Sequence, residues 1–401
     1  MKILLLQNIA SYPAIGGAAK TYSLLLEALA RRGHECLILA PGIDGILARG
    51  SRDDVRRAMA ADDLLIRSSQ DDHDVLESNG VEIHTVWDRS RLPRHFLDEL
   101  HRFDPAWVLL ASEDPGYVML RVSTTACASR VVYIALTAMA LPFGPASGRP
   151  DSSKTRLLAK AAGIVTPAAY LAGYIPQWSG LRASAIPIHF FGDEPFEDFG
   201  QANRGFVTMV NPCGLKGLPL FAALAAALPS VEFAAVPTWG TTSADRDILG
   251  RLPNVTVIPA SLRISTIFSR TRVLLVPSLW PEAYGLVAVE AMAHGIPVIA
   301  SDVGGLPEAK LGVDYVLPVN PIVSYRTDLD ENGLPIPEIP PQPVERWRET
   351  LVRLLENREE YAAVSLASRT AALAHIARST VEPFEQYLFD LSSASSTPAA
   401  S

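Results

Sequence analysis

A strand, a glycine turn, a helix and a second strand follow one another at the start of the chain, and this order restricts the fold more than any other feature. Residues 3–6 form a continuous apolar run without alternation, which is typical of a parallel strand covered on both faces. Gly16 and Gly17 come next, and apolar residues at helical spacing then lead to a stop at Gly33. A second apolar run at 36–40 completes a βαβ unit, so the sequence predicts a parallel α/β sheet.

The second half of the chain repeats this architecture. Phenylalanine, glycine and acidic residues crowd into 190–204, and a new apolar strand begins at 206–210, so we place a domain boundary between them. A turn at 214–217 and a helix at 220–228 follow. At roughly 100–200 residues per domain, a chain of 401 residues has room for two α/β domains in tandem. We expect an N-terminal domain at 1–195, a C-terminal domain at 196–375, a helix at 376–391 and a disordered tail at 392–401.

Two stretches depart from the α/β pattern. Residues 43–80 turn polar with weak periodicity, and we interpret them as a solvated excursion. Six prolines fall within 321–343, which predicts an extended surface insertion. The remaining strands are expected at 81–86, 107–111, 130–135, 163–166, 185–189, 231–235, 255–258, 273–276 and 298–300.

Charge and cysteine usage exclude several classes of protein. A net charge of −8 does not supply the basic surface that nucleic acid or an anionic bilayer attracts. Cys36, Cys127 and Cys213 are odd in number and widely spaced, which favours neither a disulfide framework nor a zinc knuckle. The first apolar run is too short for a signal peptide, and no stretch reaches the ~18 apolar residues of a membrane span. We expect a cytoplasmic protein that binds no nucleic acid and has no stable membrane insertion.

The segment 276–300 carries the strongest chemical signal. A buried strand ends at Pro277, a loop carries Glu282, and an Ala-rich helix begins near Gly285. In open α/β sheets ligands bind at the carboxyl ends of strands, where a helix N-terminus offers unpaired N–H groups to an anion. Glu290 lies five residues into this helix, about 7–8 Å along its axis at roughly 1.5 Å per residue. A diphosphate at the helix start would leave the ribose within reach of Glu290 and a sugar near Glu282, so the segment predicts a nucleotide-sugar site.

Five short motifs occur in a defined order on the expected elements. They are Gly16-Gly17, Arg32-Gly33-His34-Glu35, Lys216-Gly217, the E-x7-E pair Glu282 and Glu290, and Gly304-Gly305-Leu306-Pro307-Glu308. Together they resemble the retaining glycosyltransferases of the GT-B type, most closely family 4, over nearly the whole chain. The resemblance implies two Rossmann-like domains that face each other across a cleft. The N-terminal domain would bind the acceptor and the C-terminal domain the nucleotide-sugar, and the 376–391 helix would pack back on the N-terminal domain.

The resemblance also implies a role for each motif residue. Lys216 would neutralise the leaving diphosphate, and Glu282 would hydrogen-bond the sugar hydroxyls and orient the ring. Glu290 would hold the ribose. Gly16 and Gly17 would let the backbone approach the phosphate or the acceptor closely. The residues implied to give backbone N–H groups to the phosphates are Gly285, Leu286 and Val287.

The implied reaction is transfer of a hexosyl or pentosyl group from a nucleoside diphosphate sugar to an acceptor hydroxyl. The anomeric configuration would be retained, the leaving phosphate would help to take the acceptor proton, and neither a metal nor a cofactor would be needed. The low lysine content and acidic balance argue against a lipid-linked acceptor at an anionic membrane. A soluble acceptor follows, either a natural product or other small molecule, or a glycan.

Two positions depart from the family's pattern. Asn211 stands where an arginine is common, five residues before Lys216, so it would donate hydrogen bonds to the donor phosphates without a charge. Leu136-Thr137 stand where many relatives have a histidine. These departures keep open a catalytically weak GT-B scaffold or partner subunit. A nicotinamide-dependent dehydrogenase is disfavoured because the adjacent Gly16-Gly17 do not give G-x-G-x-x-G spacing, and a nucleotide-sugar epimerase is a more distant alternative.

Overall fold

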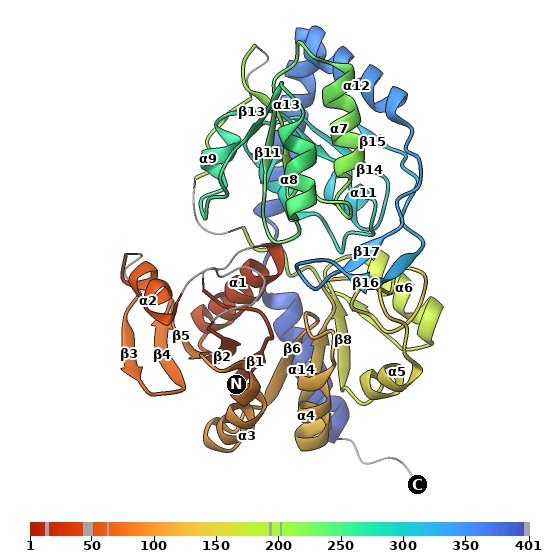
Figure 1. Ribbon diagram of the computed structural model, residues 1–401. Helices are drawn as coiled ribbons and strands as arrows, with labels where there is room; N and C mark the ends of the chain where they lie inside the picture. The colour runs from red at the N-terminus through yellow and green to blue at the C-terminus, as the bar shows by residue number, and fades with distance from the viewer. Residues whose placement is uncertain (13–15, 43–50, 62–63, 192–194, 201–202, 397–401) are drawn as a thin grey trace. The chain divides into compact units, whose positions relative to one another are not determined.

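The computed structural model describes residues 1–12, 16–42, 51–61, 64–191, 195–200 and 203–396. The chain divides into two compact units, described separately below (Figure 1). The first unit combines Met1–Phe190 with Ser379–Ser401, and the second unit spans Phe191–Arg378. Both units are α/β with parallel strands at their centre, as the sequence predicts.

The first unit is built on a nine-stranded sheet with the order β3-β4-β5-β2-β1-β6-β7-β8-β9. The strands from β5 to β9 in this order pair in parallel, whereas β3 and β4 pair antiparallel at one edge. The strands are β1 (Lys2–Leu6), β2 (Glu35–Pro41), β3 (Ile66–Ser69), β4 (His73–Ser78), β5 (Val81–Val86), β6 (Trp107–Ala111), β7 (Val131–Ile134), β8 (Gly163–Thr166) and β9 (Ser184–Ala185). The helices are α1 (Gly17–Arg31), α2 (Arg52–Ala61), α3 (Leu92–Phe103), α4 (Val118–Cys127), α5 (Ser152–Leu158), α6 (Ala169–Ser179) and α14 (Glu382–Ser396), with short 3-10 turns at Arg89–Arg91 and Ala128–Arg130.

The apolar run at the start of the chain forms the centre of this sheet. Ile3, Leu4, Leu5 and Leu6 are all 0% exposed, which is what a strand covered by helices on both faces requires. At the far edge, β9 stops at Ala185, although the strand was expected to reach residue 189. Pro187 follows within two residues and has no N–H to continue the ladder.

The interpretation of 43–80 as a solvated excursion was wrong for the residues that the structure describes. They form α2, β3 and β4, which extend the sheet at its antiparallel edge. The polar composition reflects ion pairs: the buried Asp74 carboxylate accepts from Arg52 at 2.9 Å and from Arg56 at 2.6 Å. Residues 43–50 and 62–63 lie outside the described residues.

The C-terminal helix α14 belongs to the first unit, where Figure 1 shows it in blue beside the elements from the start of the chain. Phe384 and Leu388 are 0% exposed and pack in the same core as Ile3. Arg32 and His34 bind the helix through its Glu385 carboxylate, each at 2.7 Å. The R-G-H-E motif therefore anchors the chain's own C-terminal helix. This helix continues to Ser396, so the tail expected from 392 is helical at its start, and residues 397–401 lie outside the described residues.

The second unit contains a six-stranded parallel sheet with the order β12-β11-β10-β13-β14-β15. Its strands are β10 (Phe206–Val210), β11 (Phe233–Val236), β12 (Val255–Val257), β13 (Thr271–Val276), β14 (Val298–Ser301) and β15 (Val316–Leu317). Its helices are α7 (Leu218–Ala227), α8 (Ser243–Gly250), α9 (Ser265–Phe268), α10 (Leu286–Ala293), α11 (Leu306–Ala309), α12 (Val344–Glu356) and α13 (Arg358–Ile376). The proline-rich insertion contains the antiparallel pair β16 (Tyr325–Leu329) and β17 (Pro335–Pro337). No helix among the described residues is both long and apolar enough to cross a bilayer.

Candidate active site

Three of the predicted site residues meet at one edge of the second sheet. β10 and β13 are parallel neighbours, so the loops that follow them leave the sheet at the same side. The loop after β10 carries Asn211 and Lys216, and the loop after β13 carries Glu282. Gly217 lets these loops touch, because a Cβ at its φ of +89° would overlap the carbonyl oxygen of Pro277. The glycine of the K-G motif thus brings the lysine to the acid.

Lys216 and Glu282 form an ion pair. The Lys216 Nζ lies 2.5 Å from the Glu282 Oε1, and the two side chains are only 18% and 13% exposed. The Ser278 hydroxyl donates to the same Oε1 at 2.5 Å. The Nζ also lies 4.6 Å from the ring centre of Trp280 and 5.8 Å from that of Trp239. The ammonium group is therefore held by a carboxylate and two aromatic rings at the strand ends, where it can meet an anionic ligand.

The G-G-x-P-E motif holds the loop that carries Glu282 through backbone contacts. Glu282 forms a parallel bridge with Gly304, and the Gly305 N–H donates to the Glu282 carbonyl oxygen at 2.8 Å. A Cβ at Gly304, which has a φ of +63°, would overlap the backbone nitrogen and oxygen of Glu282. The two glycines therefore allow a backbone approach that sets the position of the acid.

Helix α10 begins where the sequence predicts. Gly285 is the N-cap residue and has no side chain that could accept a hydrogen bond. The N–H groups of Leu286 and Val287 in the first turn are therefore not capped by the side chain of the N-cap residue. Ala288 and Ala291 on this helix are 0% exposed, and Glu290 is 9% exposed. Glu290 is therefore not a solvated surface acid. A carboxylate buried to this extent is costly unless it meets hydrogen-bond donors.

Asn211 supports a neighbouring loop and keeps one donor group unpaired. Its side chain is 4% exposed, and its Oδ1 accepts from the Gly240 N–H at 3.0 Å, which fixes the loop that carries Trp239. Among the described residues, the Asn211 Nδ2 has no hydrogen-bond partner, and neither does the Trp280 Nε1. Two buried donors thus lie unpaired in the residues around Lys216, a pattern that calls for an acceptor-rich ligand.

Cys213, in the same loop, is not a nucleophile. Burial raises the pKa of its thiol to about 12, so it stays protonated at neutral pH. Gly16 and Gly17 lie in the first unit, where Gly16 precedes α1 with a φ of +96° and both residues are exposed. Thr137, which follows the end of β7, has a buried hydroxyl without a hydrogen-bond partner among the described residues.

The first unit also contains a partly buried acid that sequence reasoning missed. Glu113 follows the carboxyl end of β6, where its carboxylate accepts from the Tyr22 hydroxyl at 2.7 Å and from the Ser112 hydroxyl at 3.1 Å. Burial raises the pKa of Glu113 above its usual range. The neighbouring Asp114 caps α4 by accepting from the Met119 N–H at 2.7 Å, whereas Glu113 binds the Tyr22 side chain of α1. The position at a strand end was the signal that could have identified it.

Part of the chain matches a known family of enzymes. Residues 247–310 match the family Glycosyl transferases group 1. The D-inositol 3-phosphate glycosyltransferase of Mycobacterium leprae is 40% identical over 114 residues, which make up 26% of this chain and 26% of that protein. The protein of the same name from Mycobacterium tuberculosis is 40% identical over 114 residues, or 26% of this chain and 23% of that protein. The chain thus spans about a quarter of the length of the curated relatives it matches.

Solved structures resemble the chain over nearly its whole length. Sucrose-phosphate synthase from Thermosynechococcus elongatus has a TM-score of 0.69 at 17% identity and covers 98% of this chain and 100% of its own. HepE from Anabaena, in complex with UDP and glucose, has a TM-score of 0.65 at 18% identity with the same coverage. At these identities the likeness shows the fold, which is GT-B. The part of the chain that matches the glycosyl transferases group 1 family contains Glu282, Gly285 and Glu290, and the whole chain has the GT-B fold.

Proposed function

We propose that the chain is a glycosyltransferase that moves a sugar from a nucleoside diphosphate sugar to an acceptor hydroxyl with retention of configuration. The observation that carries this proposal is the Lys216–Glu282 pair at the ends of β10 and β13, followed by the start of α10. A cation, a helix N-terminus and two acids on 282–290 together match the charge pattern of a diphosphate that joins a ribose to a sugar. The relative HepE was solved with UDP and glucose.

Each group has a task in this reaction. The diphosphate accepts from the Leu286 and Val287 N–H groups and from the Lys216 ammonium. The buried Glu290 accepts from the ribose hydroxyls, and Glu282 accepts from a sugar hydroxyl with the oxygen that does not face Lys216. The unpaired Asn211 Nδ2 donates to a phosphate oxygen. Its amide adds a hydrogen bond in the place where the family commonly has a charge.

The transfer step then needs no protein base. The bond between the anomeric carbon and the phosphate oxygen breaks, and the leaving diphosphate keeps the electron pair, while Lys216 stabilises the added charge. The acceptor oxygen bonds to the anomeric carbon on the same face, and its proton passes to the leaving phosphate oxygen. The positive charge that this step requires comes from Lys216 and the helix start, so we propose a metal-independent reaction.

We place the acceptor on the first unit, and we expect a hydroxyl of a small molecule or a glycan. Gly16 and Gly17 offer exposed backbone there, and Glu113 offers a carboxyl group at a strand end. We also propose a cytoplasmic location, which agrees with three free, buried cysteines.

A panel of nucleoside diphosphate sugars with cell extract as the acceptor source tests the proposal. Mass spectrometry should show a glycosylated product together with release of the nucleoside diphosphate. Lys216→Ala should lower turnover by at least about tenfold, or ~1.4 kcal/mol of barrier, whereas Lys160→Ala, a change at an exposed lysine, should not. Binding of a donor without turnover across the panel would instead favour a scaffold or partner subunit, an alternative that the missing charge at Asn211 keeps open.

A further inference from the structure

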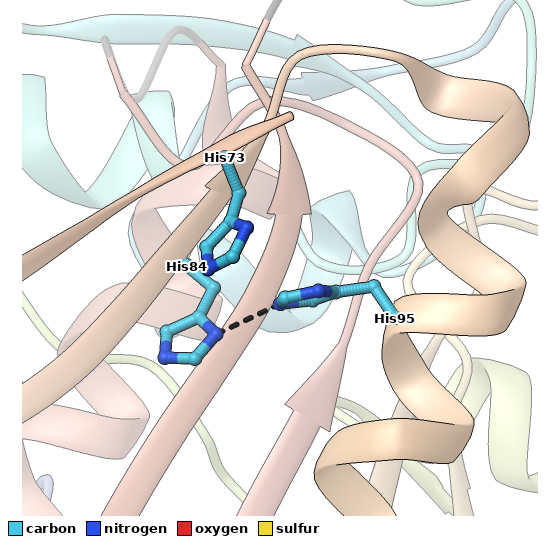
Figure 2. A group of neighbouring side chains, drawn as sticks. All are labelled: His73, His84 and His95. Atoms are coloured by element: carbon cyan, nitrogen blue, oxygen red, sulfur yellow. Dashed lines mark hydrogen bonds between the residues drawn. The ribbon is translucent and has the colours of Figure 1, made fainter. Parts of the chain in front are cut away.

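Three histidines of the first unit lie together, outside the residues discussed above (Figure 2). They are His73 on β4, His84 on β5 and His95 on α3. The His84 Nδ1 lies 2.8 Å from the His95 Nε2, and one ring nitrogen from each of the three lies within 4.8 Å of those of the other two. His73 and His84 are 8% and 3% exposed, so the cluster is mostly enclosed.

Backbone pairing fixes this arrangement. In the antiparallel register, His73 lies opposite Val86 and Val75 lies opposite His84. Side chains two residues apart share a face, so His73 and His84 are diagonal neighbours on one face of the sheet. The helix α3 packs beside that face and contributes His95, as Figure 2 shows. β4, β5 and α3 therefore each contribute one imidazole to the same cluster.

Two carboxylates determine which ring nitrogens hold lone pairs. The Asp72 Oδ1 lies 2.8 Å from the His73 Nδ1, and the Glu82 Oε1 lies 2.8 Å from the His84 Nε2. An ionised carboxylate only accepts, so these two ring nitrogens carry hydrogens. The opposite nitrogens, the His73 Nε2 and the His84 Nδ1, then hold lone pairs when the rings are neutral. A carboxylate behind an imidazole is the arrangement that orients metal-binding histidines in proteins.

A carboxylate of the same helix lies near one of the three histidines. Glu99 is 7% exposed, and its Oε1 lies 3.9 Å from the His84 Nδ1. Its other oxygen accepts from the Arg102 Nε at 2.6 Å, which holds the carboxylate in place. Three imidazoles suit a tetrahedral zinc ion with one position left for a further ligand, whereas magnesium and calcium prefer sites made of oxygen ligands.

We propose that His73, His84 and His95 bind one zinc ion that ties β4 and β5 to α3 within the first unit. On binding, the single proton of the neutral His95 ring moves from Nε2 to Nδ1, and the Nε2 lone pair binds the zinc ion. Three protein ligands leave the fourth position of a tetrahedral zinc to water or to the Glu99 carboxylate near His84. The three histidines are spaced eleven residues apart and match no common zinc motif, which explains why the sequence alone did not indicate the site.

The proposal does not depend on the transfer reaction, and untagged full-length protein tests it. After dialysis against a chelator, the protein should take up one zinc per chain, measured by elemental analysis, and its thermal midpoint should rise on addition of zinc. Cobalt in place of zinc should give the visible absorption of a tetrahedral site. At a temperature where the metal-free chain stays folded, glycosyl transfer should continue at its former rate, so this test and that of the proposed function can fail separately.

Variants locate the site. His95→Gln should weaken zinc binding by at least about a hundredfold, whereas His101→Gln, a change at an exposed histidine on the same helix, should not alter it. Glu82→Gln, which removes the carboxylate behind His84, should weaken binding by about 10–100-fold. The proposal is overturned if the wild-type chain binds no stoichiometric zinc or cobalt, or if His101→Gln loses as much affinity as His95→Gln. The measurement on the wild-type chain decides the matter even if a variant fails to fold.

Discussion

At the scale of single residues, the ion pair between Lys216 and Glu282 compensates two charges that are mostly buried. The Nζ and Oε1 atoms lie 2.5 Å apart, and both side chains are mostly buried. An unpaired charge in such a place is costly, so the ion pair offsets the burial of both side chains. An ammonium group has three hydrogens to donate. Lys216 can therefore bind a phosphate oxygen without leaving Glu282.

The unpaired amide of Asn211 gives a prediction at this scale. Asn211→Asp keeps the oxygen that accepts from the Gly240 N–H, so the fold of the loop should be preserved. It replaces the unpaired Nδ2 with a second carboxylate oxygen, which repels a diphosphate and cannot donate to it. We expect nucleoside diphosphate affinity, measured by calorimetry, to fall by at least about tenfold, or ~1.4 kcal/mol. Unchanged affinity would show that Asn211 does not face the phosphates.

Lys310 gives a prediction about stability and pH. Burial lowers its pKa to about 7, and its Nζ donates to the Val298 carbonyl oxygen at 2.5 Å. Between pH 7 and the pKa of about 10.4 of an unfolded lysine, the unfolded chain binds the proton and the folded chain does not. Stability should therefore rise with pH in this window, by at most about 1.4 kcal/mol per pH unit.

The matched variant Lys310→Met lacks this proton and keeps the buried stem. Thermal midpoints of both proteins at pH 7 and pH 9 isolate the lysine, since the other titrating groups are shared. We expect the wild-type midpoint to rise relative to that of Lys310→Met. A constant difference between the two midpoints would show that the amine is not held neutral in the folded chain.

The sequence predicts a site residue when that residue stands in a recognisable local motif. Glu282 and Lys216 were predicted because each stands in a short motif after a buried strand, but their ion pair was not, because it joins residues on two separate loops. Glu113 was missed although it also follows a strand, because no motif surrounds it. The cluster of His73, His84 and His95 arises from strand register, which no local pattern specifies.

At the scale of elements, the loop after β13 holds its shape through the loop after β14. Gly304 bridges to Glu282, and the backbones approach so closely that no side chain fits between them. The following helix α10 is buried along most of its length. The proposed donor site thus rests on closely packed backbone, and contacts of the Glu282 main chain, not of its side chain, position this acid.

Gly304→Ala should displace the Glu282 loop and lower kcat by at least about tenfold, or ~1.4 kcal/mol of barrier. Gly312→Ala is the matched control: Gly312 also has a positive φ, of +80°, but a Cβ there meets nothing within 4 Å. Both changes carry the backbone strain of an alanine at positive φ, about 1–2 kcal/mol. Rates measured well below the midpoints of both variants separate the effects. Equal loss of kcat in the two variants would contradict the positioning role of Gly304.

Elements made of uninterrupted apolar runs were the predictable ones. The strand expected at 107–111 occurs with those bounds, because burial on both faces leaves an apolar run as a direct trace in the sequence. The antiparallel edge made by β3 and β4 was not predicted, because its polar side chains are satisfied by partners distant in sequence, such as Arg56 for Asp74. At this edge, ion pairs between residues distant in sequence stabilise the strands, so no local apolar pattern marks them.

At the scale of the whole molecule, the chain returns at its end to the unit where it began. The helix α14 places Phe384 in the core of the first unit, while Phe389 on the same helix is 44% exposed. Phe384→Ala should therefore destabilise the first unit by about 3–5 kcal/mol. Phe389→Ala should change stability by less than about 1 kcal/mol. Urea unfolding followed by circular dichroism measures both, and similar losses would show that α14 does not close this core.

The account depends most on the binding of a nucleotide-sugar by residues 282–290. The most direct test measures nucleoside diphosphate affinity and turnover side by side for the wild type, Glu290→Ala and Glu282→Ala. We predict that Glu290→Ala loses nucleotide affinity by at least about tenfold, or ~1.4 kcal/mol, because the ribose loses its acceptor. Glu282→Ala should keep most of that affinity and lose turnover and sugar selectivity. Wild-type affinity and turnover in both variants would contradict the account.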